Sequence, residues 1–74
     1  MERTANRRPV LPPALSSIVI DELGGVTAVS KICEISTAAV AQWRKKGIPK
    51  PRVQFLRERF RGYPVMSKEE IQHL

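Results

Sequence analysis

Glycine and proline divide this 74-residue chain into short pieces, which limits what it can fold into. Helix stops fall at Gly24-Gly25, Gly47-Ile48-Pro49 and Gly62-Tyr63-Pro64. Because glycine supplies left-handed backbone geometry and proline cannot continue a helix, we expect no helix to pass these points. No stretch alternates polar and apolar residues with the period of a half-buried strand. We therefore predict an all-α fold, a compact bundle of about five short helices.

Capping residues and apolar spacing define the expected helices. They lie between Pro12 and Gly24, over Val26 to Cys33, from the cap Ser36 to Lys46, from Pro51 to Gly62, and from Ser67 to Leu74. On the first of them, the helical period gathers a set of apolar residues on one face: Leu15, Ile18, Val19 and Leu23. Ser67 and Glu70 have the spacing of a capping box for the last helix.

Length and composition narrow the class of function. A chain of 74 residues is one small domain whose core holds about a dozen large side chains. The net charge of +6 favours polyanionic partners, such as nucleic acid or an acidic membrane surface. The single cysteine, Cys33, and the absence of metal-ligand spacing indicate a reducing cytosol and no cofactor. No carboxylate pair, nucleophile or phosphate loop indicates an enzyme, and no apolar run is long enough for a membrane span.

The segments 26–33 and 36–46 are two short helices joined by a tight turn, the spacing of a helix-turn-helix. In such a motif the second helix can lie in a major groove of DNA. At about 100° per residue, one side of this helix collects the residues that suit a protein core: Ser36, Ala39, Val40, Trp43 and Gly47. The opposite side contains no large hydrophobic residue and consists of Ala38, Ala41, Gln42 and Lys45. The helix therefore has separate core and outward faces.

The outward face suits base readout. Alanine can contact a thymine methyl group, Gln42 can pair in a bidentate way with adenine, and Lys45 can reach guanine or a phosphate. The alternative for the alanines is that they are good helix formers on a solvated surface.

Positive charge is concentrated after this face. Between residues 44 and 61 one acid, Glu58, stands against eight basic residues: Arg44, Lys45, Lys46, Lys50, Arg52, Arg57, Arg59 and Arg61. Cations at the end of a helix also favour its dipole, but Lys50 and Arg52 lie beyond that helix. Phosphate contact accounts for the whole cluster, so the charge favours DNA over a solvated surface.

The sequence "LGGVTAVSKICEISTAAVAQWRKKGIP" resembles the Cro-like repressors of temperate phages and prophages. The resemblance covers residues 22–52 and implies a homodimer that represses transcription at operator DNA in the cytoplasm of a bacterial host, associated with the nucleoid. It also implies that Thr27 touches the DNA backbone, and that the chain beyond Arg52 ends in helices or in a β-hairpin. Glu34 departs from the family, which commonly has glycine there, and a left-handed Glu34 costs about 1 kcal/mol.

These observations combine into a predicted interface and a predicted domain organisation. The expected DNA contacts are Thr27, Ser36, Thr37, Ala38, Ala41, Gln42, Arg44, Lys45, Lys46, Lys50 and Arg52. Residues 1–11 are expected to form a flexible basic arm, and residues 12–74 the DNA-binding domain with a C-terminal helical dimerisation segment. Arg3, Arg7 and Arg8 of the arm either follow a minor groove or belong to a soluble tail.

The expected dimer contacts are Phe55, Tyr63, Val65 and Leu74, with a dimer that is weak in the absence of DNA. Phe55 has an alternative position against the last helix. Two other functions compete with the repressor. One is an antitoxin-like or adaptor module that binds protein, with a secondary role in DNA binding. The other is a basic amphipathic membrane binder, which does not account for the capped turn or the polar outward face.

Overall fold

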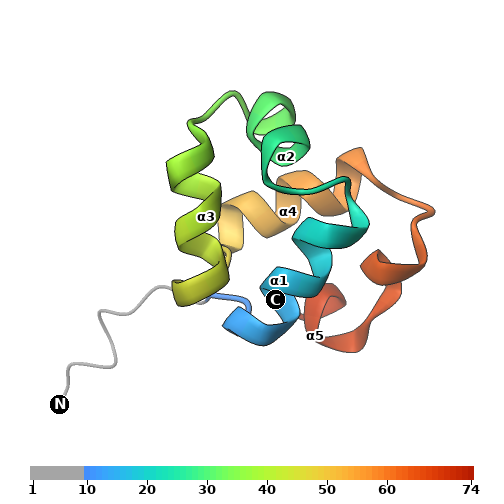
Figure 1. Cartoon of the computed structure of the whole chain (residues 1–74). Helices are drawn as coiled ribbons and strands as arrows, with labels where there is room; N and C mark the ends of the chain where they lie inside the picture. Colours follow the sequence, from blue (N-terminus) through green and yellow to red (C-terminus); the bar gives the residue numbers. More distant parts are fainter. Residues whose placement is uncertain (1–9) are drawn as a thin grey trace, which may run out of the picture.

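Helices account for most of the part of the chain that the computed structural model describes, residues 10–74 (Figure 1). The elements are α1 (Pro13–Glu22), α2 (Val26–Cys33), α3 (Thr37–Lys46), α4 (Lys50–Arg59), the 3-10 helix η2 (Pro64–Ser67) and α5 (Glu69–Gln72). Within residues 10–74 the sole β pairing is a single bridge between Val10 and Pro49. The predicted all-α bundle is confirmed, and the C-terminal part is helical instead of a β-hairpin.

Helix α1 lies in the middle of the bundle and contacts α2, α3 and η2 (Figure 1). The fully buried apolar side chains come from almost every part of the described chain: Leu11, Ile20, Val29, Val40, Ile48 and Ile71. Leu56 adds the contribution of α4, with 1% of its surface exposed. Because the core draws on all these segments, the position of each helix depends on the others.

The buried face of α1 differs from the predicted one. Ile18 is 46% exposed, whereas Ser16 and Ile20 are fully buried. The Ser16 hydroxyl donates a hydrogen bond to the Leu11 carbonyl oxygen (3.1 Å) and accepts one from the Ile48 N–H (3.0 Å). A hydroxyl that both donates and accepts loses little on burial. The prediction that Ile18 faces the core was therefore wrong, because the buried face of α1 includes Ser16 and Ile20 instead.

The N-terminal boundary of the domain also needs correction. Leu11 was assigned to the flexible arm, but it is fully buried, and its N–H donates to the Ile48 carbonyl oxygen at 2.9 Å. Val10 forms the bridge to Pro49. The segment Val10–Leu11 thus belongs to the folded domain, and the rest of the predicted arm, residues 1–9, lies outside the described residues.

The helix-turn-helix follows its predicted local structure. Helix α2 ends at Cys33, and Glu34 adopts left-handed geometry with φ 59° and ψ 45°. Ser36 caps α3, because its side-chain oxygen accepts a hydrogen bond from the Ala39 N–H at 3.1 Å. Helix α3 ends at Lys46, followed by Gly47 with φ 95°. Both the left-handed turn at Glu34 and the serine cap are confirmed.

The last predicted cap is not formed. Ser67 ends η2 and donates its hydroxyl to the Pro64 carbonyl oxygen (2.7 Å). Helix α5 begins after Lys68 and has no side-chain cap. The capping box of Ser67 and Glu70 was therefore wrong. This end of the chain is held instead by burial of Val65, Met66 and Ile71.

Candidate nucleic-acid interface

Helix α3 lies at the edge of the bundle, with α1 and α2 packed on its inner side (Figure 1). Its inner face buries Val40 completely and leaves Trp43 with 7% exposure, as predicted. The outward residues are all exposed: Ala38, Ala41, Gln42 and Lys45. The exposed outward face and the burial of Val40 and Trp43 are thus confirmed, but Ser36, expected on the core side, is exposed and Ala39 is half-buried.

Exposed hydroxyl groups lie near the start of each helix of the motif. Thr27 opens α2 and is exposed, as are Ser36 and Thr37 at the start of α3. The Ser36 oxygen accepts the Ala39 N–H, and its O–H remains as a donor for a further partner. Hydroxyl groups and helix N-termini are common phosphate contacts.

Among residues 10–74, the cations nearest the end of α3 have no acidic partner. Within residues 10–74, no carboxylate lies within ion-pair distance of Lys45, Lys46, Lys50 or Arg52. Lys45, Lys46 and Arg52 are exposed, and Lys50 is half-buried. These cations are referred to below as the free basic group. Their charge is available to an anionic partner because no described residue neutralises it.

Arg44 differs from its neighbours on α3. Its guanidinium donates to the Asp21 carboxylate of α1 at 2.6 Å, and the Arg44 side chain is 33% exposed. This ion pair connects α3 to α1 and neutralises part of the charge. Arg44 was predicted to be a phosphate contact, but in the structure its guanidinium pairs with the Asp21 carboxylate of α1.

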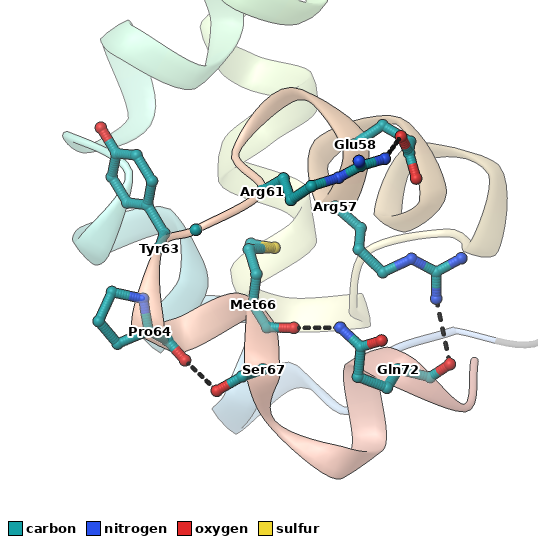
Figure 2. A pocket seen from close by; sticks show the side chains of 9 residues that line it. Arg57, Glu58, Arg61, Tyr63, Pro64, Met66, Ser67 and Gln72 are labelled. Atoms are coloured by element: carbon teal, nitrogen blue, oxygen red, sulfur yellow. Dashed lines mark hydrogen bonds and ion pairs between the residues drawn. The ribbon is translucent and has the colours of Figure 1, made fainter.

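The other half of the basic cluster is directed toward the protein itself (Figure 2). The Arg57 guanidinium donates to the carbonyl oxygens of Ile71 and Gln72, both at 3.1 Å. Arg61 pairs with Glu58, and the Arg59 guanidinium lies 5.4 Å from the centre of the Phe60 ring. Arg57, Glu58 and Arg61 line a hollow of about 470 Å³ together with Tyr63 and Gln72. Arg57 thus connects α4 to the C-terminal residues, whereas the exposed Arg61–Glu58 pair contributes little to stability.

The predicted dimer contacts divide into surface and core residues. Phe55 and Tyr63 are 44% and 46% exposed, and the Tyr63 ring meets the edge of Phe60 with centroids 5.0 Å apart. Val65 is buried, and Leu74 is partly buried against the core. Of the four residues, the two aromatic ones have surface to offer to a partner.

A shallow groove of about 560 Å³ runs beside α3, and sequence analysis missed part of it. Residues from α3 line it, including Ala38, Gln42 and Lys46, together with Val10 and Pro49 from outside the helix. Val10 had been assigned to the arm. The local signal for its role is the apolar pair Val10–Leu11 directly after a charged segment, since such a pair favours burial.

Cys33 is a further reactive side chain among the described residues. Burial raises the pKa of the Cys33 thiol, and the nearby charge of Arg52 lowers it by a smaller amount. The free thiol is thus kept protonated and behaves as a small apolar side chain.

Among residues 10–74, no group of three acidic, histidine or cysteine side chains is arranged to hold a metal ion. None of the helices there has the length and apolar character that a membrane crossing requires.

Comparison of the chain with protein-family models, with curated proteins and with solved structures finds no match.

Proposed function

We propose that the protein binds double-stranded DNA in a sequence-specific way, with α3 in the major groove, and acts as a Cro-like transcriptional repressor. One observation carries this proposal. The outward face of α3 has only small and polar side chains, and the free basic group borders it, whereas Arg57, Arg59 and Arg61, further along the chain, contact groups of the protein itself. An anionic partner that approaches α3 would therefore meet uncompensated positive charge.

The chemistry of the outward face fits base edges. A major groove about 12 Å wide admits an α-helix, and small residues let the helix axis approach the bases closely. Gln42 can accept from and donate to adenine, Ala38 and Ala41 can contact thymine methyl groups, and Lys45 can reach guanine. Gln42 is the residue on which we expect sequence preference to depend most.

The surrounding groups fit phosphates. Lys46, Lys50 and Arg52 supply charge beyond the end of α3. Thr37 supplies a hydroxyl donor at the start of α3, and Thr27 supplies one near the start of α2. Such contacts fix the register of a helix on the duplex but carry no sequence information. Arg44 contributes less, because Asp21 competes with phosphate for its guanidinium.

A homodimer on DNA completes the proposal. One helix covers only a few base pairs, too few to select an operator among the competing sites of a bacterial genome. Two-fold pairing doubles the site and sets the two copies of α3 about 34 Å apart, so half-sites repeat at about ten base pairs. Phe55 and Tyr63 are the exposed residues that support such pairing. The protein would act in the bacterial cytoplasm, at the nucleoid.

Selection of bound duplexes from a random pool tests the proposal, followed by titration of the selected site and of random duplex. Gln42→Ala should weaken binding to the selected site by about 1–3 kcal/mol and leave binding to random duplex unchanged. Gln54→Ala, an exposed glutamine of α4, is the matched control and should change neither affinity. Equal losses on both duplexes for Gln42→Ala would remove this residue from base readout. A pool that yields no preferred sequence would favour the adaptor function instead.

A further inference from the structure

The groove beside α3 is continuous with the outward face of that helix. Ala38, Gln42 and Lys46 line the groove, and the same three residues line a second hollow over Ala41 and Lys45 on the outward face. These shared residues form the border between the two surfaces. A duplex that lies against the outward face would therefore meet the groove as well.

Part of the groove lining is apolar and comes from outside α3. Val10 and Pro49 line it and form the antiparallel bridge. The Leu11 N–H, which donates to the Ile48 carbonyl oxygen at 2.9 Å, holds the same segment beside the end of α3 (Figure 1). A Cβ atom on Gly47 would lie 3.4 Å from Cγ2 of Val10, so the Val10 side chain lies directly at the end of the helix.

This apolar lining is open to a partner. The Val10 side chain is 42% exposed although the bridge holds its backbone, and Pro49 and Ala39 beside it are half-buried. Covering such a surface is favourable when the partner brings an apolar group, whereas a polar group would lose its water without a hydrogen bond in return. The groove therefore selects for an apolar group on whatever lies against α3.

The major groove of DNA offers such a group on one base. Its base edges present hydrogen-bond donors and acceptors, and thymine alone adds a methyl group, at C5. Lys46 stands at the border of the groove, and among residues 10–74 no carboxylate lies within ion-pair distance of it. Its charge would draw a phosphate strand, with the bases attached to it, to this side of α3.

We propose that the groove formed by Val10, Ala39 and Pro49 takes the C5-methyl group of a thymine beside the base pair that Gln42 reads. Val10 is then a specificity-determining residue that reaches the bases from outside the helix-turn-helix. This inference rests on the proposed function. It differs from thymine contact by the alanines of the outward face, because it adds a base position that α3 alone would not read.

The test replaces each thymine of the selected site in turn with uracil, which keeps the hydrogen-bonding groups and removes only the methyl group. At one thymine of each half-site, this replacement should weaken binding by the wild type about three- to five-fold, the factor expected for one buried methyl group. Val10→Ala should weaken binding to the thymine form by a similar factor. The same variant should bind the thymine and uracil forms of that position nearly equally.

Ile18→Ala is the matched control. Ile18 is exposed to a similar degree, 46%, but lies on α1 in a hollow with Glu22 and Lys68. This variant should keep the wild-type difference between thymine and uracil at every position. The melting temperature of Val10→Ala should equal that of the wild type, because the side chain is exposed and the bridge joins backbone groups.

The outcomes separate this inference from the proposed function. A wild-type chain that selects a sequence but binds thymine and uracil forms equally overturns the methyl contact and leaves the proposed function standing. A difference that Val10→Ala retains at every position assigns the methyl groups to Ala38 and Ala41 and overturns the role of Val10. Equal losses by Val10→Ala on both forms indicate contact with deoxyribose and overturn the assignment to a methyl group. A wild-type chain that prefers no sequence overturns the proposed function, and this inference fails with it.

Discussion

Two turns of this protein have the same tripeptide pattern, glycine, any residue, proline, but the middle residue is buried in one turn and exposed in the other. Gly47-Ile48-Pro49 follows α3, and Gly62-Tyr63-Pro64 follows α4. Both glycines have positive φ, 95° and 101°. Ile48 is fully buried, whereas Tyr63 is 46% exposed. A Cβ atom on Gly47 would lie 2.1 Å from the Leu11 carbonyl oxygen, whereas one on Gly62 would meet nothing within 4 Å.

The difference comes from a second chain segment. Val10–Leu11 crosses the first turn, and the Leu11 N–H donates a hydrogen bond to the Ile48 carbonyl oxygen. Ile48 is buried there, and the Leu11 carbonyl oxygen leaves no room for a side chain at Gly47. No such segment crosses the second turn within residues 10–74. A short motif therefore specifies that the helix ends, but the surroundings decide whether the turn is part of the core. The basic residues around the two turns also differ: within residues 10–74, Lys46, Lys50 and Arg52 near the first turn have no ion-pair partner, whereas Arg57 and Arg61 near the second contact groups of the protein itself.

The largest expected effect is that of Gly47→Ala. The new methyl group would collide with backbone and would also force alanine into a positive φ, so we expect a loss of about 2–5 kcal/mol of unfolding free energy. Gly62→Ala, the control, has only the backbone strain and should lose about 1–2 kcal/mol. Urea denaturation of both variants measures the difference. Equal losses would mean that Val10–Leu11 does not restrict the first turn.

Ser16→Ala should have the next largest effect. It removes the hydroxyl that joins the Ile48 N–H to the Leu11 carbonyl oxygen in a fully buried place. A buried donor without its partner costs about 1–3 kcal/mol. Ser67→Ala serves as the control at the second turn: its bond to Pro64 is exposed, and we expect a change of about 0.5 kcal/mol or less. If Ser67→Ala cost as much as Ser16→Ala, the asymmetry between the turns would be refuted.

Glu34→Gly extends the comparison to a third turn with positive φ, the one between α2 and α3. Because Glu34 adopts φ 59° without being glycine, replacement by glycine removes left-handed strain, although it also gives the unfolded chain more freedom. We expect a net gain of up to about 1 kcal/mol, seen as a higher melting temperature. Glu22→Gly at the end of α1 should instead cost about 1 kcal/mol, since that residue is helical. A lower melting temperature for Glu34→Gly would contradict the strain.

The smallest expected effect is the change in the salt dependence of DNA binding when one basic residue is removed. Arg52→Ala should make the salt dependence of DNA binding shallower by about one unit, because one phosphate contact is lost. Arg61→Ala should leave the slope unchanged, because Arg61 pairs with Glu58 beside the second turn. Gel-shift titrations between low and moderate salt measure both slopes. A shallower slope for Arg61→Ala and not for Arg52→Ala would reverse the assignment of the two halves of the basic cluster.

Local signals were sufficient for the helix-turn-helix. The cap at Ser36, the end of α3 at Gly47 and the inward position of Trp43 on α3 all depend on residues within a few positions of each other, whereas the left-handed Glu34 was expected from the resemblance to the Cro-like repressors. Hydrogen bonds of caps and turns join near neighbours in the chain, so they can be predicted from the sequence. The outward face of α3 was predictable for the same reason, since it needs only the helical period.

Contacts between distant residues were beyond such reasoning. The buried position of Ser16 depends on the Ile48 N–H, 32 residues away, and the partner of Arg44 is Asp21, 23 residues away. The helical period alone predicted that Ile18 would be buried. The sequence by itself determined where α2 and α3 begin and end and which face of α3 is polar. Only the tertiary structure decided which serine is buried, which arginines are free, and where the chain enters the domain, because these depend on partners that only folding brings together.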